Sequence, residues 1–359
     1  MKIKILKAGN GDSILLSFKD GKENRNILID GGIGDTYKSS SNVNGDLFKV
    51  IKQIQENEQC IDLLILTHFD DDHIGGILRW LNKDKEAPKL IKKVWFNSGK
   101  EIAKKFESDE NKDLDIEITE GADDFHTSPK QGIKFEKYLR DNNLWEGQII
   151  EQGLEFILFG AKFKTLSPNN EKLDILLKLY EKQKDYFTSG NGEYDFKIPL
   201  KDFIDEENKL NFKFKGDTSI ANGSSIAFIM EYENKSFLFL GDAHPSVVIE
   251  GLKMFGYDKY NPLNTELMKV SHHGSAYNTN KELLEIVKTD NYLISSNATK
   301  HGLPNKRTIA RIIDNNPTAI IRFNYDLKDK IFLEEDWISF AFFKSKETNE
   351  FTYKWMKTI

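Results

Sequence analysis

The sequence predicts an α/β fold in which two β-sheets pack face to face with helices outside, a four-layer αββα sandwich. Two observations carry this prediction. Apolar runs of strand length alternate with amphipathic helical stretches over the first hundred residues, and the same alternation returns after residue 224. A dense group of metal-binding side chains at 68–73 directly follows one of these strands. In such a sandwich the sheet edges converge on one cleft, where those side chains would lie.

The first half of the chain alternates apolar and polar residues from its start, as in Lys2-Ile3-Lys4-Ile5. We expect strands at 2–7, 12–19, 25–30, 61–66 and 92–97, and helices at 46–56 and from Gly75-Gly76 to Leu81. In the second half we expect strands at 224–232, 235–241, 266–270 and 291–296, and helices at 245–256, 280–287 and 306–313. The whole chain, 1–359, is predicted to be one domain.

Two stretches, about 98–147 and 168–216, are rich in Lys, Glu, Asp and Asn and are predicted to be insertions around the mouth of the site. They contain helical patterns at 100–107, 131–143 and 170–183, and core strands are expected between them at 148–157 and 161–166. Solvated decoration and a role in substrate binding both stay open for them. A C-terminal β extension, about 317–359, is expected to hold strands at 319–324, 338–344 and 350–354, with the last two forming a hairpin.

Residues 66–76 read LTHFDDDHIGG and carry four metal-binding side chains within six positions: His68, Asp70, Asp72 and His73. The preceding strand ends in a turn that can aim alternate side chains into one cleft. Imidazole nitrogens and carboxylate oxygens suit Zn, Mn or Fe. A capped helix start with solvated aspartates is the alternative, but it does not account for two histidines in the same turn. The pattern predicts a site for two metal ions.

This pattern resembles the HxHxDH signature of the metallo-β-lactamase-fold hydrolases, with Asp70 in place of the middle His. The variant HxDxDHxGG resembles the hydrolase domain of the ComEC competence proteins and their free-standing relatives. Other stretches match the family in the expected order, over about residues 1–315: NILIDGG at 26–32, FLFLGD at 237–242, KVSHHGS at 269–275, and ISSN with HGLP at 294–304. The resemblance implies a metallo-β-lactamase sandwich with a binuclear centre of Zn²⁺ or Mn²⁺.

The resemblance also implies roles for single residues. His68, Asp70, Asp72, His73, Asp242 and His301 would bind the ions, with Asp242 bridging them and His301 on the second ion. Asp30 would support the metal loop. The family usually has a further His some twenty residues before the bridging Asp, but here that place reads ANGSS, 221–225. Asn222 and Ser225 would therefore be weak oxygen ligands or supports, and an oxygen-rich first site favours Mn²⁺ more than a His-rich one does.

His272 and His273 follow the strand at 266–270. Successive strand side chains face opposite ways, so we expect only one of the two rings to reach the site. Together with Asp72, that His is the predicted catalytic residue: Asp72 would orient or accept a proton of the attacking hydroxide, and the His would protonate the leaving group. His244 is expected at the surface or in support of the site, and His126 in the first insertion at the surface or in a lid.

Composition narrows the setting of the protein. Its 359 residues contain one cysteine, Cys60, so an internal disulfide is excluded and a reducing, cytoplasmic location is expected. No apolar run has the length of a membrane span, and the net charge of −6 argues against a broad basic surface for duplex DNA. Two of the arginines, Arg307 and Arg311, follow His301 on a predicted helix. They would either clamp a substrate phosphate or form a solvated helix face.

Three functions are consistent with the sequence. The first is a phosphodiesterase or nuclease that uses a hydroxide bridging two metal ions, with nucleic acid or another phosphodiester as its substrate. The second is a small-molecule ester or lactone hydrolase, because one fold hosts many chemistries. The third, from another class, is a metal-binding or interaction protein without catalysis, which the complete set of ligand residues disfavours. A protein partner or a homo-oligomer is compatible with all three, and no membrane association is expected.

Overall fold

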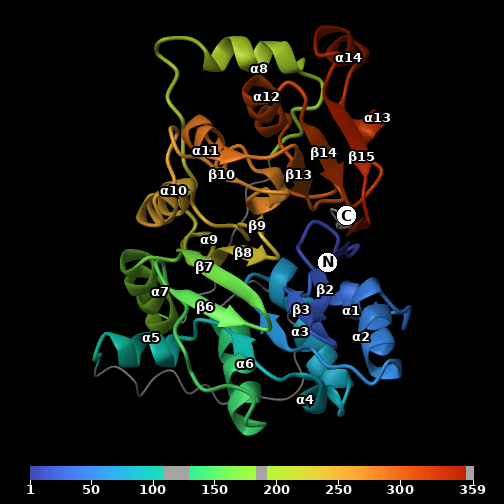
Figure 1. Ribbon diagram of the computed structural model, residues 1–359, viewed down its shortest axis with the longest axis vertical. Coiled ribbons are helices and arrows are strands. Elements are labelled where there is room, and N and C mark those ends of the chain that lie inside the picture. Colours follow the sequence, from blue (N-terminus) through green and yellow to red (C-terminus); the bar gives the residue numbers. More distant parts are fainter. Residues whose placement is uncertain (109–128, 183–191, 353–359) are drawn as a thin grey trace.

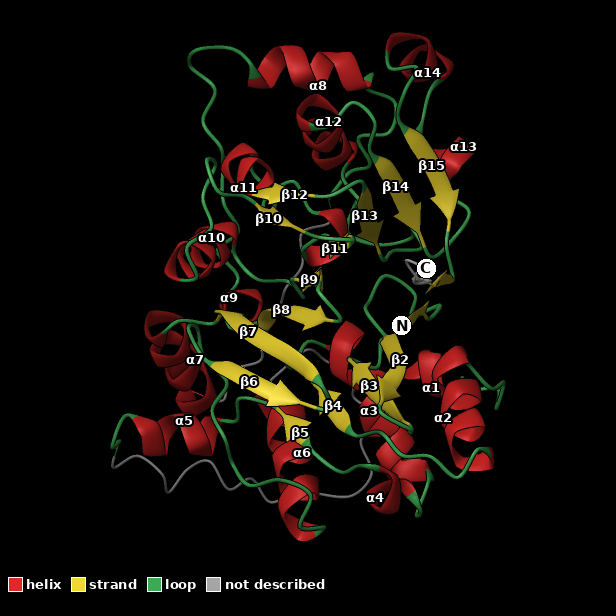
Figure 2. Ribbon diagram, viewed as in Figure 1, coloured by secondary structure: helices red, strands yellow, loops and turns green. Residues whose placement is uncertain are grey.

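The computed structural model describes residues 1–108, 129–182 and 192–352, and within them the chain forms two large β-sheets packed face to face (Figures 1 and 2). The first sheet has the order β16 (Glu350–Thr352), β1 (Lys2–Ile5), β2 (Ile14–Asp20), β3 (Glu23–Ile29), β4 (Leu63–Ile65), β5 (Val94–Trp95). The second has the order β15 (Lys344–Glu347), β14 (Ile320–Phe323), β13 (Asn291–Ile294), β11 (Leu267–Lys269), β9 (Lys235–Phe239), β8 (Ala227–Tyr232), β7 (Ala161–Ser167), β6 (Glu155–Leu158). A separate small pair joins β10 (Leu263–Asn264) to β12 (Val287–Lys288).

Helices lie on the outer face of each sheet, as the sequence predicts. On the first sheet these are α1 (Gly34–Tyr37), α2 (Asp46–Glu56), α3 (Asp71–Lys83), α4 (Ala87–Leu90), α5 (Gly99–Lys105), α6 (Pro129–Asp141) and α7 (Asn170–Lys182). The remaining helices are α8 (Leu200–Glu207), α9 (Ile220–Gly223), α10 (Pro245–Met254), α11 (Lys281–Ile286), α12 (Lys306–Asn315), α13 (Lys328–Ile331) and α14 (Glu334–Ser339). The model therefore has the four-layer αββα arrangement.

The alternation of side chains along the strands explains the layers. Ile14 and Leu16 on β2 point into the apolar core between the two sheets, whereas Leu15 between them points into the core under the outer helices. On β9, Phe237 likewise faces the inter-sheet core and Leu238 the outer core of the second sheet. Each sheet is thus buried on both faces, which accounts for the nearly continuous apolar strands in the sequence.

The two predicted insertions contribute to the core through their described helices. Phe135 on α6 and Tyr180 on α7 are fully buried in the same apolar cluster as Trp80 on α3. Residues 148–150, expected to begin a strand, lie outside β6, although the Asn97 side chain fixes the backbone of Ile150 by two hydrogen bonds of 2.7 and 2.8 Å. These helices therefore support the first sheet behind the metal loop.

The C-terminal extension differs from the predicted hairpin. β15 pairs in parallel with β14 in the second sheet, and β16 pairs antiparallel with β1 in the first. The intervening turn bonds to both sheets, through Thr348 N to Phe323 O and Ile5 N to Asn349 O. The expected strand at 338–344 begins instead within α14, whose first turn is acidic and is capped by the Asp336 side chain. The extension therefore ties the two sheets together.

Candidate metal centre

The loop that follows β4 brings the first group of ligand side chains to the end of the first sheet. β4 is fully buried between β3 and β5, and the chain then passes through His68 and Asp70 before α3 begins at Asp71. Asp70 is the N-cap residue of α3, but its side chain makes no capping hydrogen bond and its Oδ1 has no hydrogen-bond partner. The carboxylate is therefore left for another interaction.

Small residues let α3 approach the first sheet closely. A Cβ on Gly76 would come within 2.1 Å of the Gly31 carbonyl oxygen, so only glycine fits at this contact. A Cβ on Gly11 would come within 1.8 Å of the Asp72 carbonyl oxygen, to which the backbone N–H of Asp12 donates a hydrogen bond of 3.1 Å. The loop after β1 therefore lies directly against the metal loop.

Asp30 supports the metal loop in the way that the sequence indicates. Its Oδ1 accepts from the backbone N–H of Thr67 at 2.8 Å, and its Oδ2 accepts from the Thr67 hydroxyl at 2.8 Å. The same Oδ2 lies 2.7 Å from Nδ1 of His73. The ring is thereby fixed with Nε2 turned toward Asp242, whose Oδ2 is 3.4 Å away.

Asp242 follows β9 in the second sheet and lies at the centre of the site. Its backbone N–H donates to the Ser225 hydroxyl at 3.0 Å, and that hydroxyl is 3.5 Å from Nδ1 of His68. Asn222 lies farther out: its Nδ2 donates to Asp217 at 2.8 Å and is 3.3 Å from Nδ1 of His272. Ser225 thus holds the backbone of Asp242, and Asn222 belongs to the surroundings of His272.

Both His272 and His273 approach Asp242, so the expectation that only one could do so is wrong. Oδ2 of Asp242 is 3.9 Å from Nε2 of His272 and 3.4 Å from Nε2 of His273. The two residues lie in a short 3₁₀ turn after β11 with φ values of 46° and 52°, rather than in a strand. The alternation of strand side chains does not apply to this left-handed turn, and both rings turn to the same side.

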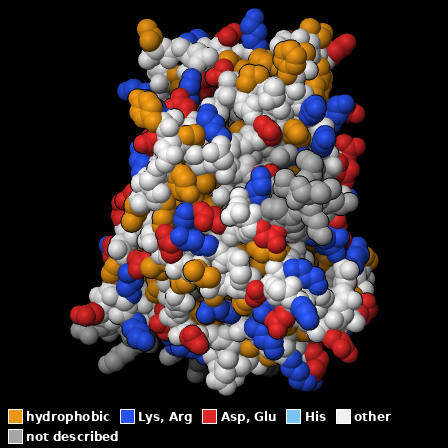
Figure 3. Space-filling view, in the orientation of Figure 1, with side chains coloured by type: hydrophobic (Ala, Val, Ile, Leu, Met, Phe, Trp, Pro, Cys, Tyr) orange, Lys and Arg blue, Asp and Glu red, His pale blue; other side chains and the backbone are white. Residues whose placement is uncertain are grey.

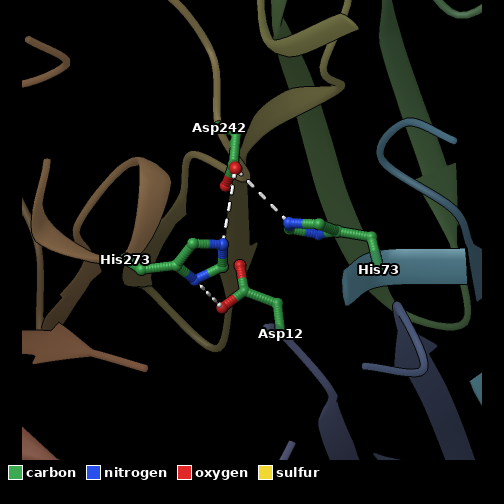
Figure 4. Close-up of side chains that lie close together, drawn as sticks. All are labelled: Asp12, His73, Asp242 and His273. Carbon is green, nitrogen blue, oxygen red and sulfur yellow. Dashed lines mark ion pairs between the residues drawn. The ribbon is translucent and has the colours of Figure 1, made fainter. Parts of the chain in front are cut away.

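The ligand atoms form two groups that share Asp242. In one group, Nε2 of His68 lies 3.7 Å from Asp70 and 4.0 Å from Asp242. In the other, Nε2 of His273 lies 3.3 Å from Asp72 and 3.4 Å from Asp242, and Nε2 of His73 lies 3.9 Å from Asp72. Figure 4 shows the rings of His73 and His273 meeting Asp242 from opposite sides.

The buried polar atoms of this cluster fit metal ions. Several potential ligand atoms of the cluster are buried and have no hydrogen-bond partner: Nε2 of His68, His73 and His273, and Oδ1 of Asp70 and Asp242. Buried polar atoms without partners cost free energy. Divalent cations would satisfy them, and mixed imidazole and carboxylate donors suit Zn²⁺ and Mn²⁺.

The charges around the cluster favour a cation in the same place. Burial alone would lower the pKa of His73 and His273, but the carboxylates of Asp242 and Asp30 around His73, and of Asp242 and Asp12 around His273, together hold both pKa values well above the usual 6.5. Burial would raise the pKa of Asp242, yet the rings of His273 and His73 hold it well below its usual range. The site therefore stabilises positive charge between its carboxylates, whether carried by protons or by metal ions.

Sequence reasoning missed three charged residues next to this cluster. Asp12 and Lys269 form a buried ion pair beside His273, and Asp217 Oδ2 lies 3.4 Å from Nδ1 of His272. Asp12 belongs to the Gly9-Asn10-Gly11-Asp12-Ser13 stretch after β1, a polar run that is buried although it joins two strands. That concentration of small polar residues could have indicated that Asp12 lies at a functional site. The sequence around Asp217 contains no comparable pattern.

The predicted role of His301 as a ligand is not what the structure shows. His301 is exposed in a turn with φ 58°, and the ring that completes the second group is His273. The spacing of the family motifs led to the prediction of His301 rather than His273, about thirty residues earlier, because each of the two residues follows a strand of the second sheet. His244 is buried at the N-terminus of α10, with Nε2 3.9 Å from Asp217, and supports the surroundings of the site. His126 lies outside the described residues.

Arg307 and Arg311 are also not placed to clamp a phosphate, because both are paired with acidic residues of α8. Arg307 bonds Glu206 at 2.7 Å, and Nε of Arg311 bonds the Glu207 carboxylate at 2.7 and 2.8 Å. Arg311 also donates to the carbonyls of Ala276 and Thr279 in the loop after the two histidines. Its role is to hold that loop.

The sequence profile of the Metallo-beta-lactamase superfamily matches residues 6–296. The chain belongs to the metallo-beta-lactamase superfamily. At this level it is a metal-dependent hydrolase of that fold, and a buried cluster of residues that could hold a metal ion, Asp12, His73, Asp242 and His273, is present. No curated protein matches the sequence.

Several solved structures are similar to the chain at low identity. The metallo-beta-lactamase fold protein YhfI from Bacillus subtilis is 9% identical with a TM-score of 0.43, covering 98% of this chain and 99% of its own. A putative metal-dependent hydrolase from Parabacteroides distasonis is 9% identical with a TM-score of 0.39, covering 89% and 92%. The Zn²⁺-bound PqqB from Methylobacterium extorquens is 11% identical with a TM-score of 0.39, covering 98% and 100%.

Proposed function

We propose that this metallo-beta-lactamase protein is a binuclear phosphodiesterase or nuclease that binds two Zn²⁺ or Mn²⁺ ions. The observation that supports it best is the pair of ligand groups around Asp242 beside a partly exposed His272. The side chains of His68, Asp70, His73 and His273 are at most 7% exposed, whereas those of Asp72 and His272 are 25% and 26% exposed. A substrate would therefore reach the centre between Asp72 and His272.

His272 is held in an orientation suited to proton transfer. Its Nδ1 lies 3.0 Å from Oδ1 of Asn278 and 3.4 Å from Oδ2 of Asp217, so those oxygens can accept its N–H. Nε2 is then directed toward Asp242 and the opening. A phosphodiester leaves as an alkoxide, which is a poor leaving group, and a proton from Nε2 would assist its departure.

Divalent ions bound at these ligands would lower the pKa of a water molecule and polarise a phosphoryl oxygen. The chain supplies the positions: His68, Asp70 and Asp242 for one ion, and Asp72, His73, His273 and Asp242 for the other. Asp72, at the opening, would also accept a hydrogen bond from the attacking water. His272 stays available for the leaving group.

The surface charge is consistent with attraction of phosphate at the centre itself. The net charge is −6, and in Figure 3 basic and acidic side chains are interspersed over the visible face. Bound cations would provide local positive charge where a phosphate must lie. Among the described residues no helix is both long and apolar enough to cross a bilayer.

The test is hydrolysis of bis-p-nitrophenyl phosphate and of a p-nitrophenyl carboxylic ester by protein reloaded with Zn²⁺ or Mn²⁺. We expect phosphodiester hydrolysis that chelation abolishes, followed by activity on a member of a panel of single- and double-stranded DNA, RNA and cyclic dinucleotides. Asp242→Asn should be inactive, whereas Asp326→Asn, at an exposed position, serves as a matched control against contaminating nuclease. Ester hydrolysis without phosphodiester hydrolysis would contradict the proposal and favour the ester or lactone hydrolase.

A further inference from the structure

A buried ion pair between Asp12 and Lys269 lies directly beside the metal centre. The two side chains are 2% and 1% exposed, and they come from the loop after β1 and from β11, in different sheets. Nζ of Lys269 also donates to the Gly241 carbonyl at 3.0 Å and is 3.8 Å from Oδ1 of Asp242. Burying two charges carries a large desolvation cost, which good pairing and additional hydrogen bonds offset.

Asp12 meets His273 at Nδ1, the ring nitrogen that does not face Asp72. Its Oδ1 is 3.5 Å from Nδ1 of His273, while Nε2 of that ring faces Asp72 and Asp242 at 3.3 and 3.4 Å (Figure 4). Nδ1 is also 3.1 Å from the Ser295 carbonyl oxygen. Oδ2 of Asp12 is held by Lys269, while the buried Oδ1 makes no hydrogen bond. Asp12, His73, Asp242 and His273 each offer a ligand atom within 4.8 Å of the others, so a positioning role and a ligand role for Asp12 differ in the number of ions bound.

The same relation exists on the other ring of this metal group. Asp30 lies 2.7 Å from Nδ1 of His73, whose Nε2 is 3.4 Å from Asp242. Each ring thus has a carboxylate near Nδ1 and metal-ligand atoms at Nε2, but the contact of Asp12 is longer than that of Asp30, and Nδ1 of His273 hydrogen-bonds to the Ser295 carbonyl. A carboxylate at the far nitrogen of a metal-binding His fixes the tautomer and the ring orientation.

We propose that Asp12, held by Lys269, is a positioning residue that keeps His273 presenting Nε2 to the second metal ion, and that Asp12 is not itself a ligand. The proposal rests on the binuclear metal centre proposed above, but not on the identity of the substrate. Lys269 satisfies one oxygen of Asp12 and leaves the other for the ring. It also links this support to the Gly241-Asp242 turn that carries the shared ligand.

The test compares the wild type with Asp12→Asn and with the double variant Asp12→Asn/Lys269→Met, which leaves no buried charge unpaired. The matched control is Asp336→Asn/Lys306→Met, which removes another fully buried Lys–Asp pair that joins α12 to α14. Zn²⁺ affinity is measured by competition with a chelating dye, and zinc content at saturation by mass spectrometry. Protein labelled with ¹⁵N-histidine reports by NMR which ring nitrogen of His273 carries the proton.

We expect both Asp12 variants to bind the weaker-held zinc about 10- to 100-fold less tightly than the wild type. Both should still hold two ions at saturation, and the His273 signals should show loss of the single Nδ1–H form. The control pair should bind zinc as the wild type does, even if its melting temperature falls. Metal-free melting curves identify which variants are folded.

Three outcomes would overturn the proposal. Unchanged zinc affinity and an unchanged His273 tautomer in a folded Asp12 variant would show that Asp12 does not position the ring. Loss of one ion at saturation would show that Asp12 is a ligand. A wild-type chain that binds no zinc would remove the binuclear centre and this inference with it, whereas a two-zinc wild type without phosphodiesterase activity would contradict only the proposed function.

Discussion

At the scale of single residues, the Asp242 carboxylate is the point at which the imidazole rings meet. Its Oδ2 lies between 3.4 and 4.0 Å from Nε2 of four histidines: His68, His73, His272 and His273. The first two come from the first sheet and the last two from the second. Asp242 therefore couples the two sheets as well as the two ligand groups.

His272 should act as a proton donor rather than as an essential ligand. We expect His272→Ala to reduce turnover about 10²- to 10⁴-fold on a phosphodiester with an alkyl leaving group. The loss on bis-p-nitrophenyl phosphate should be far smaller, because p-nitrophenolate leaves without a proton. His244→Ala is the matched control, since that ring is buried nearby but is not paired with Asp242. Equal losses on both substrates, or loss of a bound metal ion, would refute the acid role.

Asp12 should make the metal-free protein sensitive to acid. Burial alone would raise its pKa, but the Lys269 ammonium together with the rings of His273 and His73 lowers the pKa from 3.8 to about 2. A depressed acid pKa adds stability that is present above pH 3.8 and is lost as the pH falls through about 2. This shift corresponds to about 2 kcal/mol of unfolding free energy. Between pH 5 and 2, the unfolding free energy measured in urea should therefore fall by about 2 kcal/mol less in Asp12→Asn/Lys269→Met than in the wild type. Parallel pH profiles of the two proteins would contradict the stabilising role of the ion pair.

At the scale of elements, α12 and α14 are joined by the fully buried pair of Lys306 and Asp336. Oδ1 of Asp336 also accepts from the backbone N–H of Leu200 at 2.7 Å, and Oδ2 from that of Leu333 at 2.8 Å. One carboxylate thus holds the start of α8, the start of α14 and the amine of α12. The C-terminal extension depends on this contact.

Removing that carboxylate should be costly. Asp336→Ala leaves Lys306 buried without a counter-charge, and we expect the free energy of unfolding to fall by about 3–5 kcal/mol. The comparison is Asp314→Ala, which removes the partner of Lys281 in an exposed pair at 4.0 Å. That change should cost less than about 1 kcal/mol. Similar losses for the two variants in urea unfolding would contradict the assigned role of the buried pair.

Most elements could be predicted because their apolar spacing is regular, and α2 has the predicted bounds, 46–56. The exceptions have local causes. The 3₁₀ turn at His272 depends on two left-handed residues that no spacing reveals. The predicted hairpin of strands at 338–344 and 350–354 is wrong because α14 reaches into the first of them and because the sequence does not state which sheet an edge strand enters. Regular apolar spacing therefore predicted most helices and strands, whereas a left-handed turn and the pairing of the C-terminal strands were not predicted.

At the scale of the whole molecule, the site lies where the two sheets meet, so its ligands come from segments far apart in the sequence. The His68–His73 turn could be found by its own density of ligands. Asp12, Asp217 and the choice of His273 over His301 required the packing of the two halves. Long-range placement of single side chains is the part of the site that the sequence did not reveal.

Because metal ions would bind ligands from both sheets, their removal should lower the stability of the whole sandwich. Binding to the folded form adds about 4 kcal/mol when free metal is a thousandfold above its Kd. For a chain of this length, that corresponds to a fall of about 5 °C in the melting temperature on chelation. Calorimetry with and without a chelator measures the shift, and readdition of Zn²⁺ is the control. An unchanged melting temperature after verified metal removal would show that the ions do not stabilise the fold.

The most direct measurement is the number of divalent ions bound per chain in the reloaded wild type and in variants of each ligand group. The proposed centre predicts about two ions in the wild type, about one in His68→Ala/Asp70→Ala, and fewer than one in Asp242→Ala, because two-metal sites share their bridging ligand. His301→Ala should retain about two, since that residue is exposed. A wild type that binds no ions, or an Asp242→Ala protein that keeps two, would contradict a binuclear centre at this cluster.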